Sequence, residues 1–339
     1  MIPHAAILLE IGYHFIDPVA IPLPGPVDVR WYGLGYVFAF TVGYFVLRHL
    51  SREGDLSLDE DGISDLIFGL IVGTILGARI GYILFYDFSS FAANPARIFR
   101  LWEGGLSFHG GLIGVVLAAA WFVRKHKVSL VHVLDNLALG VPFGIFAVRI
   151  ANFVNGELYG RVTTEAVPWA MRFPTDPFAL QLMGIERVYG IRERELAILE
   201  ARDSGVWATI RDQVPLRHPS QLYEAFTEGL LLALILWTIY LVAKRRGVRL
   251  PTGLLAGVFL VGYGLFRTFV ELFRQPDAQF RDATDALGTV LGPLTMGQTL
   301  SLFVIGSGVY LLIRALTNPT PAAVKPNRQN PKSGGGRPT

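Results

Sequence analysis

The chain has 339 residues, of which 52% are hydrophobic and only 17% are charged, and its mean hydropathy is +0.43. An average soluble domain is about 25% charged, so this composition indicates an integral membrane protein. The absence of cysteine excludes disulfides, thiolate metal sites and a cysteine nucleophile in the protein itself. The net charge of +3 is small and the basic residues gather in short loops, so we expect no nucleic-acid partner.

Apolar segments follow one another along the chain at lengths typical of transmembrane helices. We predict an all-α integral membrane protein with seven spans, at 31–49, 63–85, 105–123, 131–150, 221–243, 253–273 and 295–316. The first span begins with Trp31 and Tyr32, whose amphipathic rings favour the membrane–water interface. The second contains Gly73, Gly77 and Gly81, and their four-residue spacing predicts close packing against another helix.

Basic residues mark alternate connections between the spans. The segments after the third, fifth and seventh spans hold every lysine of the chain, at 125, 127, 244, 325 and 332, and the loop after the first span holds Arg48 and Arg52. Cytoplasmic loops of membrane proteins are enriched in lysine and arginine. We therefore expect the N-terminus outside and the C-terminus in the cytoplasm.

This topology divides the chain into five parts. We expect an interfacial arm outside the membrane over 1–30, the first four spans within 31–155, an outer head over 156–220, the last three spans within 221–317, and a cytoplasmic tail over 318–339. About 60 residues can form a small folded head. The tail is rich in proline, glycine and asparagine, a composition typical of disorder.

Polar side chains from separate spans are predicted to meet near the outer leaflet. With this topology Tyr32, His109, Arg149 and Arg267 all lie toward the outer ends of their spans. Ionisable groups within spans are costly, and they usually face a bundle interior or a wet cavity. Guanidinium groups offer forked donors to phosphate oxygens, so this layer suits an anionic lipid headgroup. It also contains Arg79, Asn152, Asn155, Glu157, His218, Gln221, Tyr223, Glu224, Tyr263, Glu271 and Arg274.

Several of these residues have structural alternatives. Arg267 and Glu271 are four positions apart and can be only an ion pair on one helix. Tyr32 can be a simple interfacial anchor, and Arg79 can extend along its helix to the interface. The amides of Asn152 and Asn155 can cap or bridge helices.

His109 stands among Gly104, Gly105, Gly110 and Gly111. Glycine beside a polar residue permits close approach of a backbone or a ligand. For His109 we therefore favour a functional role.

Several long motifs resemble those of the bacterial prolipoprotein diacylglyceryl transferases, in the family's order and along nearly the whole chain. They are RWYGLGY, GARIGYILFY, GGLSFHGGLIG, RIANFVNGELYGR, RHPSQLYEA, GYGLFRTFVELFRQPD and MGQ. One departure is Ala151, where the family often has glycine. The tail carries none of these motifs.

The resemblance implies transfer of the diacylglyceryl group of phosphatidylglycerol to the lipobox cysteine thiol of prolipoprotein signal peptides. A thioether forms and glycerol phosphate is released, in the first step of bacterial lipoprotein maturation. The resemblance also implies a multi-pass protein of the inner membrane, with the head in the periplasm, the active site toward the outer leaflet and no cofactor. No metal is expected, because the histidines lack HExxH or comparable ligand spacing.

The residues that the family treats as essential correspond to Tyr32, His109, Arg149, Asn152, Gly160 and Arg267, with Glu157, Tyr263 and Glu271 in support. Our hypothesis is that His109 accepts the thiol proton, since a free cysteine has a pKa of about 8.5 and histidine one of about 6.5. Arg149 and Arg267 would bind the phosphate as it leaves. Alternatively, His109 only binds the headgroup. Asn152 and Tyr32 would orient that headgroup, and Glu157 and Glu271 would hold the arginines.

Three other classes of protein compete with this interpretation. A transporter would place its polar residues near the bilayer midplane and show inverted repeats, and no repeat is visible. An intramembrane serine protease could use Ser107, two residues before His109, but no second histidine faces it from another span. A membrane scaffold seldom concentrates so many charges within its spans.

Overall fold

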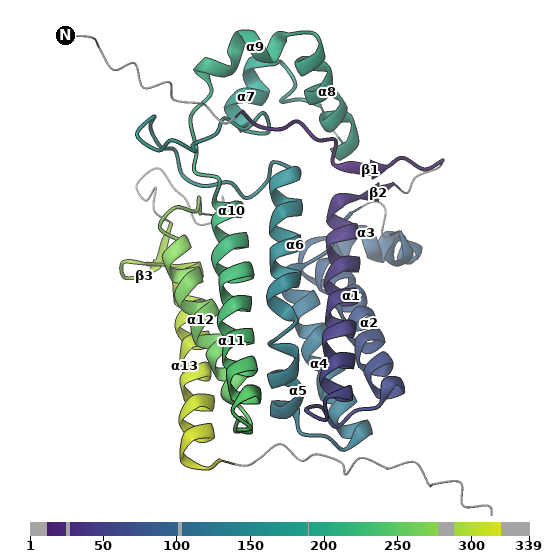
Figure 1. Cartoon of the computed structure of the whole chain (residues 1–339). Coiled ribbons are helices and arrows are strands. Elements are labelled where there is room, and N and C mark those ends of the chain that lie inside the picture. The colour runs from purple at the N-terminus through teal and green to yellow at the C-terminus, as the bar shows by residue number, and fades with distance from the viewer. Residues whose placement is uncertain (1–11, 25–27, 101–103, 189, 277–287, 320–339) are drawn as a thin grey trace, which may run out of the picture.

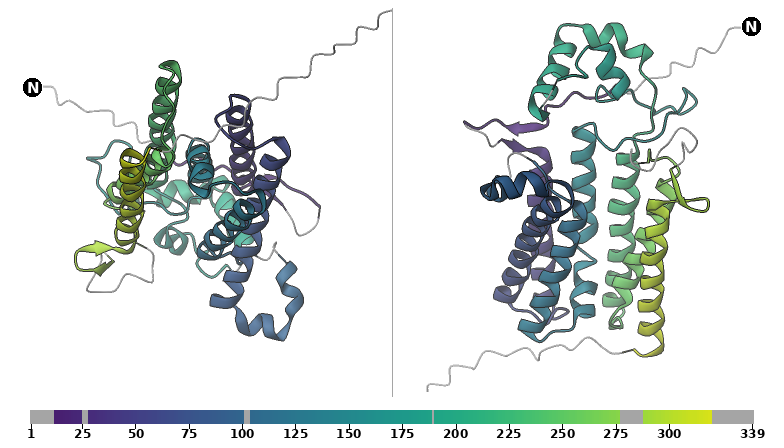
Figure 2. Two further views of the ribbon diagram at one scale, coloured as in Figure 1. Left: turned by 90° about the horizontal axis from the view of Figure 1, so that it is seen from below. Right: turned by 180° about the vertical axis from the view of Figure 1, so that it is seen from behind.

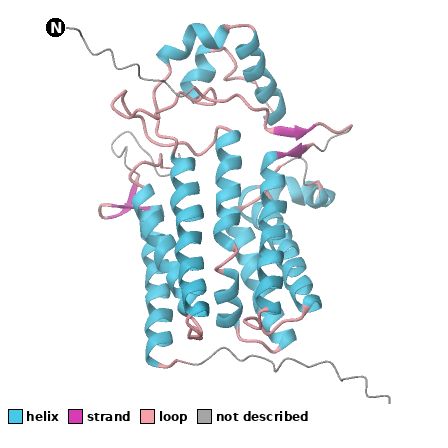
Figure 3. Cartoon of the chain, viewed as in Figure 1, coloured by secondary structure: helices cyan, strands magenta, loops and turns pink. Residues whose placement is uncertain are grey.

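The computed structural model describes residues 12–24, 28–100, 104–188, 190–276 and 288–319, and they are mostly helical (Figure 3). The predicted arm is therefore described only in part, and the predicted tail lies almost entirely outside the described residues. Two short antiparallel strand pairs accompany the helices. They are β1 (Val19–Ile21) with β2 (Val29–Arg30), and β3 (Thr289–Leu291) with β4 (Leu294–Thr295).

A bundle of long helices forms the body of the molecule (Figure 1). It contains α1 (Trp31–Arg52), α2 (Glu60–Tyr86), α4 (Phe108–His126), α5 (Leu130–Leu137), α6 (Val141–Val154), α10 (Ser220–Glu224), the π-helical η4 (Ala225–Leu231), α11 (Leu232–Arg245), α12 (Leu254–Val270) and α13 (Met296–Thr317). The short α3 (Phe88–Ala93) and η1 (Pro95–Phe99) follow α2. Helices thus occupy all seven predicted ranges.

Among the described residues, four helices are long and apolar enough to cross a membrane: α1, α2, the continuous α10–η4–α11 and α13. The pair α5 and α6, bent by 53° at its break, makes a fifth if it counts as one span. Gly140 lies at this break, and Pro142 opens α6. The shorter α12 has 17 residues, and α4 carries basic residues in its last turn. The structure therefore supports an all-α membrane protein, and the count of seven spans stays a prediction.

Glycines bring α2 and α4 into close contact, as their spacing predicts. A Cβ atom on Gly73 would lie 2.6 Å from the carbonyl oxygen of Gly114 and 2.8 Å from the Cβ of Ala118. A Cβ on Gly81 would lie 2.6 Å from the Cα of Gly110. These distances are shorter than a van der Waals contact, so only glycine permits the two backbones to approach this closely.

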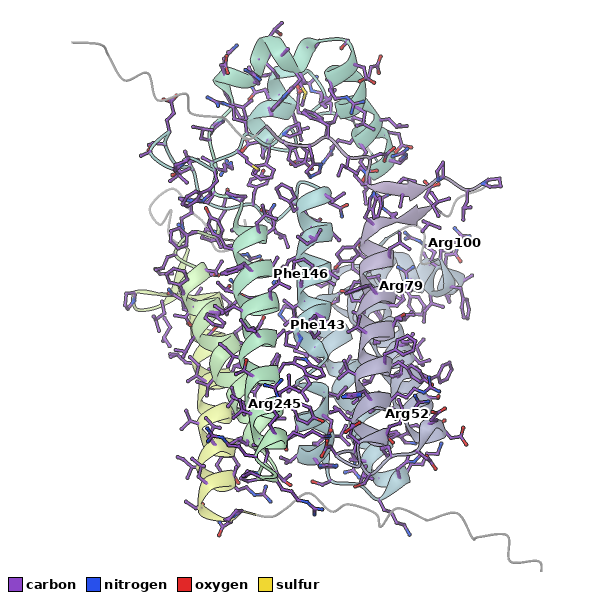
Figure 4. The ribbon with its side chains drawn as sticks, viewed as in Figure 1. Arg52, Arg79, Arg100, Phe143, Phe146 and Arg245 are labelled. Atoms are coloured by element: carbon purple, nitrogen blue, oxygen red, sulfur yellow. The ribbon has the colours of Figure 1, made fainter. Side chains whose placement is uncertain are left out.

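The central helix α6 lies between α1 on one side and η4 on the other, as the views from the end and from behind show (Figure 2). At the second contact, a Cβ on Gly229 would lie 2.8 Å from the Cβ of Phe146. Phe143 and Phe146 point from α6 into the space beside α11 (Figure 4). On the far side of η4 and α11, α12 and α13 pack together along their length. This order of helices brings α6, η4 and α12 next to one another.

A small helical head covers one end of the bundle (Figure 1). It contains α7 (Pro177–Leu182), α8 (Ile191–Asp203), α9 (Val206–Ile210) and η3 (Arg211–Gln213). The described part of the arm, residues 12–24 and 28–30, packs against it. Arg192 donates to both oxygens of Asp17 at 2.6 and 3.0 Å, and this hydrogen bonding lowers the pKa of Asp17. Arg30 pairs with Glu195.

The opposite end of the bundle carries basic side chains, with Arg52 and Arg245 labelled there (Figure 4). Lys244 lies 2.8 Å from both Glu53 and Asp55. The two ends of the bundle thus differ, with the folded head at one and the cationic residues of short loops at the other.

Candidate functional site

Three arginines and three glutamates form a connected set of ion pairs near the head end of the bundle. We call it the arginine–glutamate network. Its members come from α6, α10, η4, α12 and the residues just after α12. They are Arg149, Glu224, Glu228, Arg267, Glu271 and Arg274.

Glu224 connects the network. Its side chain is completely buried, with one carboxylate oxygen 3.0 Å from Nε of Arg149 and the other 3.4 Å from Nη1 of Arg267. Arg274 approaches the same carboxylate at 3.8 Å. A buried charge is stable only when it is paired, and here one carboxylate pairs with guanidinium groups from two helices. It therefore fixes Arg149 and Arg267 in one place, although 118 positions separate them in the sequence.

Arg267 and Glu271 form the ion pair that their spacing predicts. Nη1 of Arg267 lies 2.7 Å from Oε2 of Glu271, and Glu271 is only 3% exposed. Its other oxygen accepts a hydrogen bond from the Thr295 hydroxyl at 2.9 Å. Arg267 is therefore held from both sides, by Glu224 and by Glu271.

The amide of Asn152, in the last turn of α6, connects Arg149 to Glu157 at the start of the head. Arg149 donates to Oδ1 of Asn152 at 3.4 Å, and Asn152 donates to Glu157 at 2.9 Å. Asn155 donates to the same Glu157 oxygen at 3.1 Å. The Gln221 side chain donates to the backbone carbonyl of Glu157 at 2.7 Å. The two asparagines thus share Glu157 as a partner in the turn after α6, and Asn152 also contacts an arginine of the network.

Tyr32 and Tyr263 border the network. Their hydroxyl groups lie close enough to Arg149 to interact with it electrostatically. The Tyr32 hydroxyl is also 3.3 Å from that of Tyr36, one turn further along α1. The structure therefore places side chains of α1, α6 and α12 around one guanidinium group.

The acidic and the basic side chains of the network differ in their exposure to solvent. The side chains of Glu224 and Glu228 are 0% exposed, whereas those of Arg149 and Arg267 are 19% and 11% exposed. Within the described parts of the chain, neither oxygen of Glu228 has a hydrogen-bond partner, and its ion-pair distance to Arg149 is 3.9 Å. These two carboxylates are thus fully buried, whereas the two arginine side chains keep some exposed surface. This arrangement suits the binding of an anion with several oxygens.

Gly160 joins the head to the end of α12. Its N–H donates to the carbonyl of His218 at 2.7 Å, and it forms an antiparallel bridge with Arg274. A Cβ atom here would lie 2.8 Å from the Cβ of His218. The position is buried, so the structure assigns Gly160 a packing role that holds Arg274 beside the network.

His109 lies in the first turn of α4, and its side chain is exposed. Its helix packs mainly against α2, while the network is built on α6, α10, η4 and α12. Two of the neighbouring glycines permit close packing, which is one of the two roles expected for them. A Cβ atom on Gly110 would lie 2.8 Å from the Cα of Gly81 in α2, and one on Gly105 would lie 2.6 Å from the Tyr82 ring.

Ser107 begins α4 as its N-cap. Its side chain accepts from the N–H of Gly110 at 3.2 Å, and it is 5% exposed. A buried capping hydroxyl is a poor nucleophile for an external substrate. This observation weakens the serine-protease alternative.

The Arg79 side chain folds into the protein and binds backbone carbonyl groups. The side chain is 5% exposed and donates to the carbonyl oxygens of Gly104 at 2.7 Å, Gly105 at 3.1 Å and Ile98 at 3.1 Å. It therefore holds together the loop that returns from η1 to α4. Figure 4 shows Arg79 beside α1 on the side of α3, below Arg100.

Two further residues of the site, Glu228 and Thr295, were not predicted from the sequence, and Glu224 was placed in the polar layer without an assigned role. Glu228 had a readable signal, because it is the only charged residue between Glu224 and Lys244 of an apolar segment. Thr295 had none, because its contact with Glu271 depends on how α13 packs against α12.

Comparison with known proteins agrees with the family resemblance of the sequence motifs. A family model described as prolipoprotein diacylglyceryl transferase matches residues 18–314. Two relatives are phosphatidylglycerol–prolipoprotein diacylglyceryl transferases from Yersinia pestis (strain Pestoides F) and Yersinia pseudotuberculosis serotype O:1b (strain IP 31758). Each is 39% identical over 312 residues, which cover 91% of this chain and 97% of the relative.

Proposed function

Since this chain belongs to the prolipoprotein diacylglyceryl transferase family, we propose that it transfers the diacylglyceryl group of phosphatidylglycerol to prolipoproteins. The acceptor is the thiol of the lipobox cysteine in the signal peptide. Sulfur bonds to the glycerol carbon, the carbon–oxygen bond to phosphate breaks, and glycerol phosphate leaves. The reaction is the first step of bacterial lipoprotein maturation.

One observation supports the site most directly. Glu224 holds Arg149 and Arg267 on a shared carboxylate while both arginine side chains stay partly exposed. The lipid phosphate carries one negative charge, and more develops on it as the ester bond breaks. Hydrogen-bond donors that already point at the phosphate oxygens stabilise the transition state, because they need not move as the charge develops. Arg149 and Arg267 are therefore the phosphate-binding pair of this proposal.

The remaining residues have supporting roles. Tyr32 and Asn152 orient the headgroup, Tyr263 lines it, and Glu157 and Glu271 hold the arginines. Gly160 maintains the packing beside Arg274. His109 accepts the proton of the thiol as sulfur attacks, and its exposed position in the first turn of α4 leaves it accessible to a second substrate. If His109 instead binds only the headgroup, the thiol loses its proton without help from His109.

The chain crosses the bacterial inner membrane seven times in this proposal, with its N-terminus outside. Residues 156–220 form a periplasmic head, and the arm before residue 31 lies against it. The tail after residue 317 is cytoplasmic, together with the basic loops at the other end of the bundle. The active site then faces the outer leaflet, where the signal peptide emerges.

The direct test incubates the purified protein with phosphatidylglycerol and a lipobox peptide and measures the mass of the peptide. We expect a thioether-linked diacylglyceryl adduct, and none with a peptide whose cysteine is replaced by serine or with diacylglycerol as the lipid. Arg149→Gln and Arg267→Gln should each lower the rate by about a hundredfold or more. A normal rate in Arg267→Gln would contradict the phosphate-binding role, and a normal rate in His109→Gln would contradict the base.

A further inference from the structure

The segment that begins α13 contacts the arginine–glutamate network through Thr295, which hydrogen-bonds to Glu271. Thr295 is the N-cap of α13 and is 6% exposed. Its side chain and that of Gln298 form a capping box, which fixes the first turn of the helix. Neither the capping box nor the MGQ motif of residues 296–298 has a part in the proposed mechanism.

The Thr295 hydroxyl has two roles at once. Its oxygen accepts from the N–H of Gln298 at 3.3 Å, and its hydrogen goes to Oε1 of Glu271 at 2.9 Å. Oε2 of Glu271 faces Arg267 at 2.7 Å. The Thr295 hydroxyl therefore contacts the Glu271 carboxylate, which in turn contacts the Arg267 guanidinium group. The helix cap fixes the position of the hydroxyl.

Gly297 closes the other side of Glu271. A Cβ atom at this position would lie 2.7 Å from the carboxyl carbon of Glu271 and 2.7 and 2.8 Å from its two oxygens. Real Cβ contacts are longer, so the carboxylate would have to move. Because it is the end of a flexible side chain, the movement costs the fold little. It would, however, displace the group that orients Arg267.

We propose that Thr295 and Gly297 are positioning residues that set the place of the Glu271 carboxylate and, through it, the direction in which Arg267 meets the lipid phosphate. The inference rests on the proposed function of Arg267 and adds two residues that do not touch the substrate. It explains why the first turn of α13 combines a capping threonine with a glycine.

Gly297→Ala tests the proposal without removing any hydrogen-bonding group. Alanine is a better helix former than glycine, so the helix itself should not suffer. We expect kcat/KM for phosphatidylglycerol to fall about tenfold while the melting temperature stays within the experimental error. Gly306→Ala is the matched control, because it lies in the same helix and a Cβ there meets nothing within 4 Å. It should keep the normal rate.

Thr295 is tested by three substitutions that all preserve a helix cap. Serine keeps the hydroxyl and asparagine supplies an amide donor, whereas aspartate caps well but presents a second carboxylate to Glu271. We expect Thr295→Ser and Thr295→Asn to keep most of the activity and Thr295→Asp to lose about tenfold or more in kcat/KM. Ser129→Asp is the control, since Ser129 caps α5 without contacting the network. A role in capping alone would leave Thr295→Asp active.

A double-mutant cycle shows whether Gly297 acts through the Glu271 carboxylate. In a Glu271→Ala background Gly297→Ala should have no further effect, because the displaced group is gone. An undiminished effect there, or a normal rate in Gly297→Ala itself, would overturn the proposal. If Arg267→Gln is inactive while Gly297→Ala and Thr295→Asp are normal, the inference fails and the proposed function stands. If Arg267→Gln is fully active, both fail.

Discussion

The carboxylate of Glu224 contacts guanidinium groups from α6 and α12 at 3.0 and 3.4 Å while no part of its side chain reaches solvent. Replacing it removes three ion pairs and leaves Arg149, Arg267 and Arg274 without their shared partner. Breaking one buried pair typically costs about 3–5 kcal/mol, because the remaining charge stays buried. Arg149 and Arg267 are partly exposed, so water can offset some of this cost.

We therefore predict that Glu224→Ala lowers the melting temperature in detergent and abolishes transfer. Glu224→Gln, which retains the shape and one acceptor, should fold better but remain impaired, since its charge no longer balances the arginines. Circular dichroism during heating and the peptide transfer assay measure the two effects. The control is Glu53→Gln, whose exposed ion pair with Lys244 should leave both unchanged. An active Glu224→Ala protein would show that the arginines need no common anchor.

Local spacing explains which residue contacts could be predicted from the sequence. The Arg267–Glu271 pair follows from a four-residue separation on one helix, and the structure confirms it. The contacts of Glu224 join helices that are distant in sequence, and no periodicity specifies them. The contacts of Arg79 could not be predicted for a similar reason, because its carbonyl partners lie in η1 and just before α4.

At the scale of single helices, α2 and α4 pack closely through their glycines. Gly77 faces Gly114 so directly that an added Cβ would lie 2.8 Å from its Cα. Gly69 belongs to the same helix, yet a Cβ there meets nothing within 4 Å. Spacing alone does not distinguish these two glycines, because it does not show which face of α2 meets α4.

We predict that Gly77→Val separates the two helices and destabilises the protein by about 1–3 kcal/mol, as overpacking does elsewhere. Gly69→Val adds the same side chain to the same helix and should be tolerated. Thermal unfolding monitored by light scattering or tryptophan fluorescence compares the two. Equal melting temperatures of the two variants would contradict the prediction, because they would show that separating α2 from α4 does not destabilise the protein.

Hydrophobic blocks predicted helices in all seven ranges, but they did not predict how the helices are divided. The 131–150 range is two helices bent by 53°, with Gly140 and Pro142 at the break. The 221–243 range includes a π-helical turn around Glu228. Both features depend on tertiary packing, since π-turns and breaks persist only where neighbouring helices satisfy the backbone.

At the scale of the whole molecule, the head and the basic loops lie at opposite ends of the bundle (Figure 1). The absence of cysteine makes the orientation directly measurable, because any introduced thiol is unique. Ser204 is exposed in the head, and Arg246 is exposed just after α11. Each position accepts a cysteine without loss of a buried contact.

We predict that a membrane-impermeant maleimide labels Ser204→Cys in spheroplasts. Arg246→Cys should react only after the membrane is permeabilised. The unmodified chain, which has no thiol, is the control for background labelling. The reverse pattern would place the network at the inner leaflet and contradict the proposed topology.

The described network has as many arginines as glutamates, so with every group ionised it is neutral before any lipid arrives. A phosphodiester brings one negative charge into this neutral set, whereas a phosphomonoester can bring two. Guanidinium groups that stabilise the charge developing on the departing phosphate attract the more highly charged product at least as strongly as the substrate. Release of glycerol phosphate, rather than its formation, is then the step at which this network works against turnover.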